Sequence, residues 1–262
     1  MVTQRICIIG SGNVATHLAI ALTKAGHCVV QVVSRQFSNA QHLATRVDAQ
    51  ALTDVARIDP FVDVILLSVP DEAIEHIASQ LPMTQALVAH TAGSVLMDVL
   101  SRFDNYGVFY PFQTFSKQKH VEMLQVPFLL EANSAANLQK LEIVARCLSS
   151  RVMKADSMQR MQLHISAVMV CNFTNHLYAM AYKLLSHNNL PFELLYPLME
   201  ETTQKAKTMP PHLAQTGPAV RGDWAVVEKH MAMLAGFPGI QAIYGMMSQS
   251  IGNDHGIKRD EI

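Results

Sequence analysis

The sequence predicts an α/β fold in which a doubly wound, mostly parallel sheet is followed by an all-helical C-terminal domain. A branched apolar segment at 5–9 leads directly into a glycine-rich turn. Strand-like apolar runs then alternate with helical runs as far as residue 156, which is typical of a parallel sheet covered by helices. Beyond that point the strand-like runs stop, and helical spacing with frequent methionine takes over. We therefore expect two domains, 1–156 and 157–262.

The first predicted strand ends in a turn that can hold a dinucleotide. This turn has the G-x-G-x-x-A spacing and opens a helix predicted over 14–24. Gly10 permits the tight turn, Gly12 lacks a Cβ that would block a pyrophosphate, and Ala15 lets the helix approach the strand. Free N–H groups and the helix dipole favour phosphate there, although the same pattern also occurs as a purely structural turn. The predicted cofactor contacts are Gly10, Ser11, Gly12, Asn13, Val14 and Ala15.

The second predicted strand, 28–33, ends at Ser34 and Arg35. A NAD-binding protein normally has an acidic residue here that binds the adenosine ribose, whereas an NADP-binding protein offers a cation. No Asp or Glu occurs before Asp48. Ser34 and Arg35 can bind a 2′-phosphate, which favours NADP as the cofactor. Two alternatives stay open: Arg35 is only a solvated loop charge, or the cofactor is NAD and Arg35 points away from the ribose.

Further strands and helices alternate over the rest of the first domain. Strands are expected at 50–52, 63–70, 86–89, 107–110, 126–131 and 151–155, and helices at 40–46, 71–80, 95–103 and 134–149. Two strand exits carry small polar residues, and in a doubly wound sheet the ligand lies at the carboxyl ends of the strands. The cofactor contacts predicted at these exits are Ser68, Val69, Pro70, His90, Thr91 and Ala92.

Composition argues against several kinds of partner. The net charge of −1 and the absence of a Lys/Arg run argue against nucleic acid and anionic membrane surfaces. No apolar run approaches a membrane span, and we expect no targeting peptide ahead of the first strand. The four cysteines lie in apolar segments without a C-x-x-C pair, which predicts reduced core thiols and a cytoplasmic location. The acidic and histidine side chains at 71–76 fit a helix terminus, so no metal is predicted.

Four segments carry a resemblance to known proteins. They are 10–15, 90–94, 110–116 and 215–223. With them the chain resembles the pyrroline-5-carboxylate reductase and 6-phosphogluconate dehydrogenase-like superfamily, and more closely the Rossmann-like and DUF2520 proteins described as NADP oxidoreductases. The resemblance spans nearly the whole chain. It implies an NADP(H)-binding Rossmann domain at 1–156, a helical substrate domain at 157–262, and a homodimer formed through the helical domain.

Two candidate catalytic residues lie on the helix predicted at 158–186. Related dehydrogenases place a Lys and an Asn on this helix facing the nicotinamide, whereas this chain has His164 and Asn172. Eight residues is slightly over two turns, so the two side chains lie within about 80° of each other. His164 can exchange a proton with a carbonyl or imine centre, and Asn172 can orient the substrate oxygen. The alternative is that His164 only bonds a backbone carbonyl.

A third candidate catalytic residue, Arg221, follows a glycine turn at 215–218. Arg221 can clamp a substrate carboxylate or phosphate through two hydrogen bonds. It can equally pair with Asp223 and hold two helices together. Tyr110 and Gln113 follow a strand exit on the ligand side, and both are candidates for lining the cleft.

These observations together predict an NADP(H)-dependent oxidoreductase. It would transfer a hydride to or from a small carbonyl, imine or hydroxy-acid substrate bound between the two domains. The alternative is a non-catalytic NADP-binding sensor or scaffold. Convergence of His164, Asn172 and Arg221 near the nicotinamide would favour the enzyme, and an apolar or filled cleft would favour the sensor.

Overall fold

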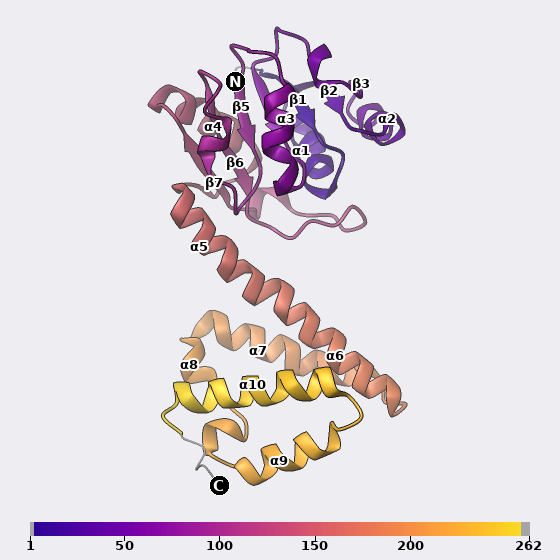
Figure 1. Cartoon of the computed structure of the whole chain (residues 1–262), viewed down its shortest axis with the longest axis vertical. Helices are drawn as coiled ribbons and strands as arrows, with labels where there is room; N and C mark the ends of the chain where they lie inside the picture. Colours follow the sequence, from indigo (N-terminus) through magenta and orange to yellow (C-terminus); the bar gives the residue numbers. More distant parts are fainter. Residues whose placement is uncertain (1–2, 258–262) are drawn as a thin grey trace. The chain divides into compact units, whose positions relative to one another are not determined.

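The computed structural model describes residues 3–257 and divides into two compact units (Figure 1). The first, which we call the sheet unit, ends at Asn172, and the second, the helical unit, begins at Phe173. Helix α5, Ser157–Ala167, is therefore part of the sheet unit. The units divide later in the chain than the boundary predicted at residue 156, which was placed where the strands end.

The sheet unit contains one eight-stranded sheet with the order β3-β2-β1-β4-β5-β6-β7-β8. The strands are β1 Arg5–Ile9, β2 Cys28–Val33, β3 Gln50–Leu52, β4 Val64–Leu67, β5 Leu87–His90, β6 Tyr106–Pro111, β7 Phe128–Ala132 and β8 Val152–Lys154. All neighbouring pairs from β3 to β6 are parallel; β7 runs antiparallel to β6, and β8 parallel to β7. The predicted doubly wound, mostly parallel sheet is confirmed.

Helices cover both faces of this sheet (Figure 1). One core contains side chains of α1 (Asn13–Lys24), α2 (Phe37–Thr45) and α4 (Ala135–Leu148), and the other contains side chains of α3 (Ile74–Gln80). Strand β1 supplies both, because successive side chains of a strand point to opposite faces: Ile6 and Ile8 enter the first core, and Cys7 and Ile9 the second.

Two local predictions in the sheet unit need correction. The helix predicted at 95–103 is only a short 3₁₀ turn, Met97–Leu100, because Leu100 and Phe103 pack into the second core without a continuous helix. All four cysteines are free, as predicted, but Cys28 and Cys171 are exposed rather than in the core. Apolar neighbours in the sequence therefore do not by themselves bury a cysteine side chain in the core.

The long helix predicted at 158–186 is present and contains an irregularity. It consists of α5, a π-helical segment at Val168–Phe173, and α6 at Thr174–His187. The first turn of α5 is held by a capping box, in which Asp156 accepts a hydrogen bond from the Gln159 N–H and the Gln159 side chain accepts one from the Asp156 N–H. π turns inside α-helices are rare and frequently mark functional sites.

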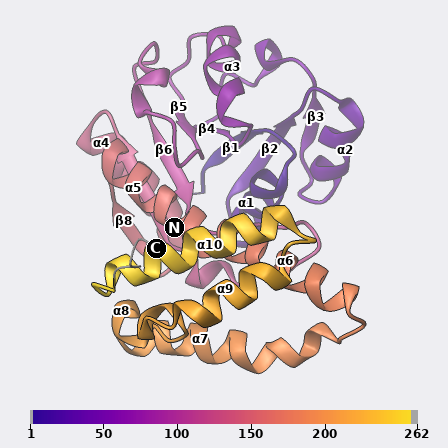
Figure 2. The ribbon, with the colours of Figure 1, turned by 60° about the horizontal axis from the view of Figure 1, so that its bottom comes forward.

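The helical unit continues from α6 through four further helices. They are α7 Tyr196–Thr208, α8 Pro211–Ala214, α9 Trp224–Met233 and α10 Pro238–Asp254. Asp223 caps α9 as predicted, accepting a hydrogen bond from the Val226 N–H at 3.4 Å. Helices α9 and α10 run side by side (Figure 2), where His230 Nδ1 lies 2.7 Å from the Tyr244 hydroxyl. Within 3–257 no helix is both long and apolar enough to cross a membrane.

Candidate active site

The glycine turn after β1 has the geometry that a bound pyrophosphate requires. Gly10 has a φ of +123°, and a Cβ at this position would lie 2.1 Å from the Ser68 carbonyl oxygen. Only glycine fits there, because both the backbone conformation and the close approach exclude a side chain. A Cβ on Gly12 would meet no atom of the chain within 4 Å, so this position faces open space. Ala15 is fully buried beneath the turn.

This turn lies at the switch point of the sheet. Strand β1 pairs with β2 on one side and with β4 on the other, and the connections after β1 and β4 lead to helices on opposite faces, α1 and α3. Gly10 at the end of β1 touches Ser68 at the end of β4. Ligands of doubly wound sheets bind in the crevice outside the carboxyl ends of such strands. The structure thus brings the turn residues and the Ser68–Pro70 exit together at one edge.

Ser34 and Arg35 lie at the same edge, after β2. The Ser34 hydroxyl is 2.9 Å from the Ser11 hydroxyl, which links the β2 exit to the glycine turn. Arg35 is exposed, and no ion pair involves it among the described residues. A free guanidinium beside two hydroxyls, with no carboxylate before Asp48, fits an anionic 2′-phosphate better than a bare ribose.

The loop that follows β5 is hydrogen-bonded to the loop that follows β4. The Thr91 hydroxyl lies 3.3 Å from both the Leu67 carbonyl and the Ser68 hydroxyl. The Ser94 hydroxyl donates a short hydrogen bond to the Asp71 carboxylate. These hydrogen bonds fix the two loops against each other.

His90 differs from the other residues of this edge because it is fully buried. Its Nδ1 accepts a hydrogen bond from the Ala92 N–H at 3.2 Å. Burial, reinforced by the positive charge of Arg160, lowers the pKa of His90 to about 3, so the ring is neutral. His90 supports the loop from within, and the predicted contact of His90 with a cofactor stays a prediction.

His164 on α5 meets the same edge through Tyr110 at the end of β6. Its Nδ1 lies 3.0 Å from the Tyr110 hydroxyl. Gly93 lies between the two rings, and a Cβ there would come within 2.6 Å of His164 Nδ1 and 2.9 Å of Tyr110 Cζ. His164 thus bonds a phenol hydroxyl, whereas the predicted structural alternative was a backbone carbonyl.

The Tyr110 hydroxyl keeps its proton at neutral pH. Burial, together with the nearby negative charge of Asp71, raises the pKa of Tyr110 to about 12. Tyr110 and His164 together therefore form a polar pair in which the phenol stays protonated and lies within hydrogen-bond distance of the imidazole.

Arg160 holds α5 on the sheet unit, one helical turn before His164. Its side chain is only 1% exposed and forms an ion pair with Glu131 at the end of β7. It also donates a hydrogen bond to the Val95 carbonyl at 2.5 Å. The sequence analysis did not predict the buried Arg160–Glu131 ion pair. The available signal was a lone Arg four residues before a candidate catalytic His, together with an acid at the end of a predicted strand.

The other two candidate catalytic residues are exposed. Asn172 lies in the π-helical segment, where each residue advances the helix by less than 100°, so eight residues from His164 come closer to two full turns than in a regular α-helix. Arg221 belongs to the helical unit and forms no ion pair with Asp223 among the described residues, so the predicted structural alternative is absent. Its convergence with His164 stays a prediction.

The glycine cradle at the switch point defines a NAD(P)-binding protein of the Rossmann class. A family model described as NADP oxidoreductase coenzyme F420-dependent matches residues 5–101, and the domain of unknown function DUF2520 matches residues 126–251. A structure from Bacteroides fragilis, called a putative NADP oxidoreductase, is 44% identical, covers 96% of this chain and 98% of that one, and has a TM-score of 0.88. The chain belongs to this family of NADP oxidoreductases with a DUF2520 domain. The predicted resemblance is confirmed, and the NADP prediction agrees with the family.

More distant structures share the fold alone. A protein from Thermotoga maritima is 21% identical with a TM-score of 0.81, covering 96% of this chain and 99% of that one. A reductive aminase from Aspergillus terreus, in complex with NADPH and ethyl levulinate, is 16% identical with a TM-score of 0.72. The match covers 98% of this chain and 97% of that one. No match was found among curated proteins.

Proposed function

We propose that this protein is an NADP(H)-dependent oxidoreductase that acts on a small carbonyl, imine or hydroxy-acid substrate, with His164 as its acid–base residue. The observation that supports this most directly is the His164–Tyr110 pair at the ligand edge of the sheet. The order of strands there is β2, β1, β4, β5, β6, so an extended dinucleotide with its 2′-phosphate at Arg35 would run towards Gly93 and Tyr110.

When bound, NADPH would supply a hydride to the substrate carbon. The oxygen or nitrogen of the reduced bond then needs one proton, which the imidazolium form of His164 gives from Nε2. His164 becomes neutral and keeps its Nδ1 proton, which it donates to the Tyr110 hydroxyl oxygen. Tyr110 acts as a positioning residue, because its raised pKa keeps the phenol protonated while it fixes the ring of His164. Oxidation of a hydroxyl group reverses these steps.

The acid–base role is tested by screening oxo and imino acids as substrates, with turnover monitored through the absorbance of NADPH. His164→Ala should lower kcat by roughly 10²–10⁴-fold with unchanged NADPH affinity. The matched control is His176→Ala, which removes an exposed histidine of α6 and should leave kcat unchanged. Full activity of His164→Ala would exclude His164 as the acid–base residue. An equal loss of kcat in His176→Ala would indicate a structural effect of removing a histidine.

The cofactor assignment is tested separately from the chemistry. Arg35→Asp should weaken NADP binding much more than NAD binding in calorimetric titrations, because the new carboxylate repels a 2′-phosphate and can bond a ribose hydroxyl. Arg57→Asp, another exposed arginine of the sheet unit, is the control for the change in net charge. Equal losses for both cofactors would show that Arg35 does not contact the adenosine ribose.

The exposed apolar residues of the helical unit support the homodimer that the resemblance implies. Large apolar side chains on α6–α10 are more than half exposed, and such surfaces are typical of subunit interfaces. They are Tyr182, Leu194, Leu198, Leu213, Met233 and Met246. Light scattering should find a dimer that Leu198→Glu converts to a monomer and that Glu200→Gln leaves intact. A monomeric wild-type chain would contradict the proposal.

A further inference from the structure

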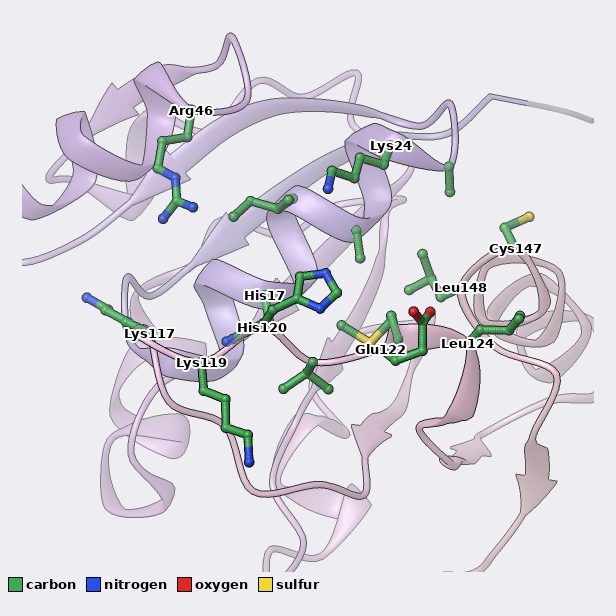
Figure 3. Close-up of a pocket in the computed structure, with 15 residues that line it drawn as sticks. His17, Lys24, Arg46, Lys117, Lys119, His120, Glu122, Leu124, Cys147 and Leu148 are labelled. Atoms are coloured by element: carbon green, nitrogen blue, oxygen red, sulfur yellow. The ribbon is translucent and has the colours of Figure 1, made fainter.

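The sheet unit contains a hollow that the proposed reaction does not use (Figure 3). It has a volume of about 530 Å³, within the range typical of small-molecule sites. Its walls come from α1, the C-terminal end of α2, the segment 117–124 and the C-terminal end of α4. Every lining residue lies between His17 and Leu148, so the hollow belongs to one unit.

Positive charges from three separate segments meet around this hollow. Lys24 comes from the end of α1, Arg46 follows α2, and Lys117 and Lys119 belong to the loop after β6. None of the four takes part in an ion pair within 3–257. Glu122 is the one carboxylate among the lining residues. Unpaired like charges repel each other, so a bound anion would relieve this repulsion.

The charges are distributed unevenly around the opening. Figure 3 shows Arg46 and Lys117 on one side and Glu122 on the other, with Lys24 above and Lys119 extending away. Because Glu122 would repel an anion, the favoured position for negative charge is on the side of Arg46 and Lys24, away from Glu122. Arg matches phosphate oxygens through two hydrogen bonds, and Lys binds phosphate as a point charge.

Most of the other lining side chains, His17 and His120 apart, are apolar, and one wall is held in place by hydrogen bonds. Ile20, Ala21, Ala25, Val121, Met123 and Leu148 line the hollow. His17 Nε2 lies 2.9 Å from the Ser116 carbonyl, and the Asn13 amide donates to the Phe115 carbonyl at 2.9 Å. These two hydrogen bonds attach the loop after β6 to α1 and so fix one wall. An apolar surface next to a cationic one suits a ligand that has both parts.

The Lys24 and Arg46 end of this hollow lies apart from the cofactor edge, whereas its His17 side lies one helical turn after Asn13. The glycine turn is at the N-terminus of α1, whereas Lys24 is the last of its twelve residues. Twelve residues of α-helix span about 18 Å. Arg46 likewise follows the C-terminus of α2, while Arg35 precedes its N-terminus.

We propose that this hollow is a second binding site, for a phosphate-bearing ligand of nucleotide size. Its phosphates lie beside Arg46 and Lys24, and its apolar part covers the Ile20 and Leu148 side chains. Free nucleotides and other phosphorylated metabolites share this chemistry. The proposal does not depend on the reaction at His164, since none of the residues that line the hollow belongs to that site.

The probe is adenosine triphosphate, titrated calorimetrically into the full chain with and without saturating NADPH. We expect one saturable event per chain that persists in the presence of NADPH. The double variant Lys24→Gln/Arg46→Gln should weaken it at least tenfold. Adenosine, which lacks phosphate, should show no binding.

The matched control is Arg57→Gln/Lys207→Gln, which removes one arginine and one lysine at exposed positions outside the hollow. It should change the affinity less than twofold. Three results would overturn the proposal: no binding of the probe, binding abolished by NADPH, or an equal loss in the control. The second would assign the probe to the cofactor edge, and the third to net surface charge.

Discussion

The two units of this chain differ in how they bury their apolar side chains. The sheet unit has a core on each face of its sheet, in which Leu18, Ile65 and Phe109 are at most 2% exposed. Among residues 173–257 only Ala219, Val227, Ser248 and Gly252 are buried. The helical unit therefore keeps most of its apolar surface uncovered within one chain. A parallel sheet covered on both faces completes its own core, whereas a few amphipathic helices need another surface.

Buried charge follows the same division. The sheet unit encloses the Arg160 side chain and holds it against Glu131, while the Lys205 and Glu201 side chains of an ion pair in the helical unit are 43% and 61% exposed. A buried arginine needs a fixed surrounding that pairs its charge, which Glu131 and the Val95 carbonyl provide here, although Arg160 Nε has no hydrogen-bond partner among the described residues. Such a fixed surrounding exists at the sheet edge, which is where the candidate catalytic pair lies.

The largest expected effect is that of breaking the buried ion pair. Arg160→Met should destabilise the sheet unit by about 3–5 kcal/mol, because Glu131 loses its partner in a partly buried position. Chemical denaturation measures the free energy of unfolding. Arg146→Met, which breaks an exposed pair with Glu142, should cost at most about 1 kcal/mol. Equal losses in the free energy of unfolding for Arg160→Met and Arg146→Met would contradict the expected difference between a buried and an exposed ion pair.

Truncating apolar side chains tests the difference in burial directly. Leu141→Ala, at a fully buried position of α4, should cost about 2–5 kcal/mol. Leu213→Ala, at a position 68% exposed in the helical unit, should change the free energy of unfolding of the isolated chain by less than about 0.5 kcal/mol. A large cost for Leu213→Ala that grows with protein concentration would show that a partner covers it.

Acid should weaken the sheet unit through His90. Its pKa of about 3 lies below the value of 6.5 for a free imidazole, so between these pH values the unfolded chain binds a proton that the folded chain does not. Stability is therefore complete above about pH 6.5 and falls on acidification, by up to about 1.4 kcal/mol per pH unit. His90→Gln should remove this contribution, and His212→Gln, exposed in the helical unit, should retain it. If the free energy of unfolding falls with pH at the same slope in His90→Gln and in the wild type, His90 is not the source of the acid sensitivity.

The smallest expected effects are equal in the two units. Ser134 caps α4 in the sheet unit and Asp223 caps α9 in the helical unit, each through a hydrogen bond to a backbone N–H. Replacing either residue with Ala should cost about 1 kcal/mol, because a cap is a local interaction that does not depend on the surrounding core. Thermal unfolding of both variants measures this, and a cost confined to one unit would mean that tertiary contacts dominate.

Local features were predictable from the sequence because their causes are local. The bounds of β1, β2 and β3 match the prediction, since each is an apolar run bounded by turn residues. The glycine turn was recognised from its spacing, and its φ of +123° at Gly10 agrees with that reading. The cap at Asp223 likewise depends only on the next three residues.

Contacts between distant segments could be decided only by the tertiary structure. Tyr110 and His164 are 54 residues apart, and nothing in the spacing of either element indicates that Gly93 lets their rings meet. The Arg160–Glu131 pair, the burial of His90 and the π-helical segment Val168–Phe173 are likewise decided by the tertiary structure. Turns, caps and strand periods arise from backbone geometry over a few residues, so the sequence alone determined the class of fold and its nucleotide turn. Side-chain partners and pKa values depend on the packing of whole elements, and only the folded chain decided them.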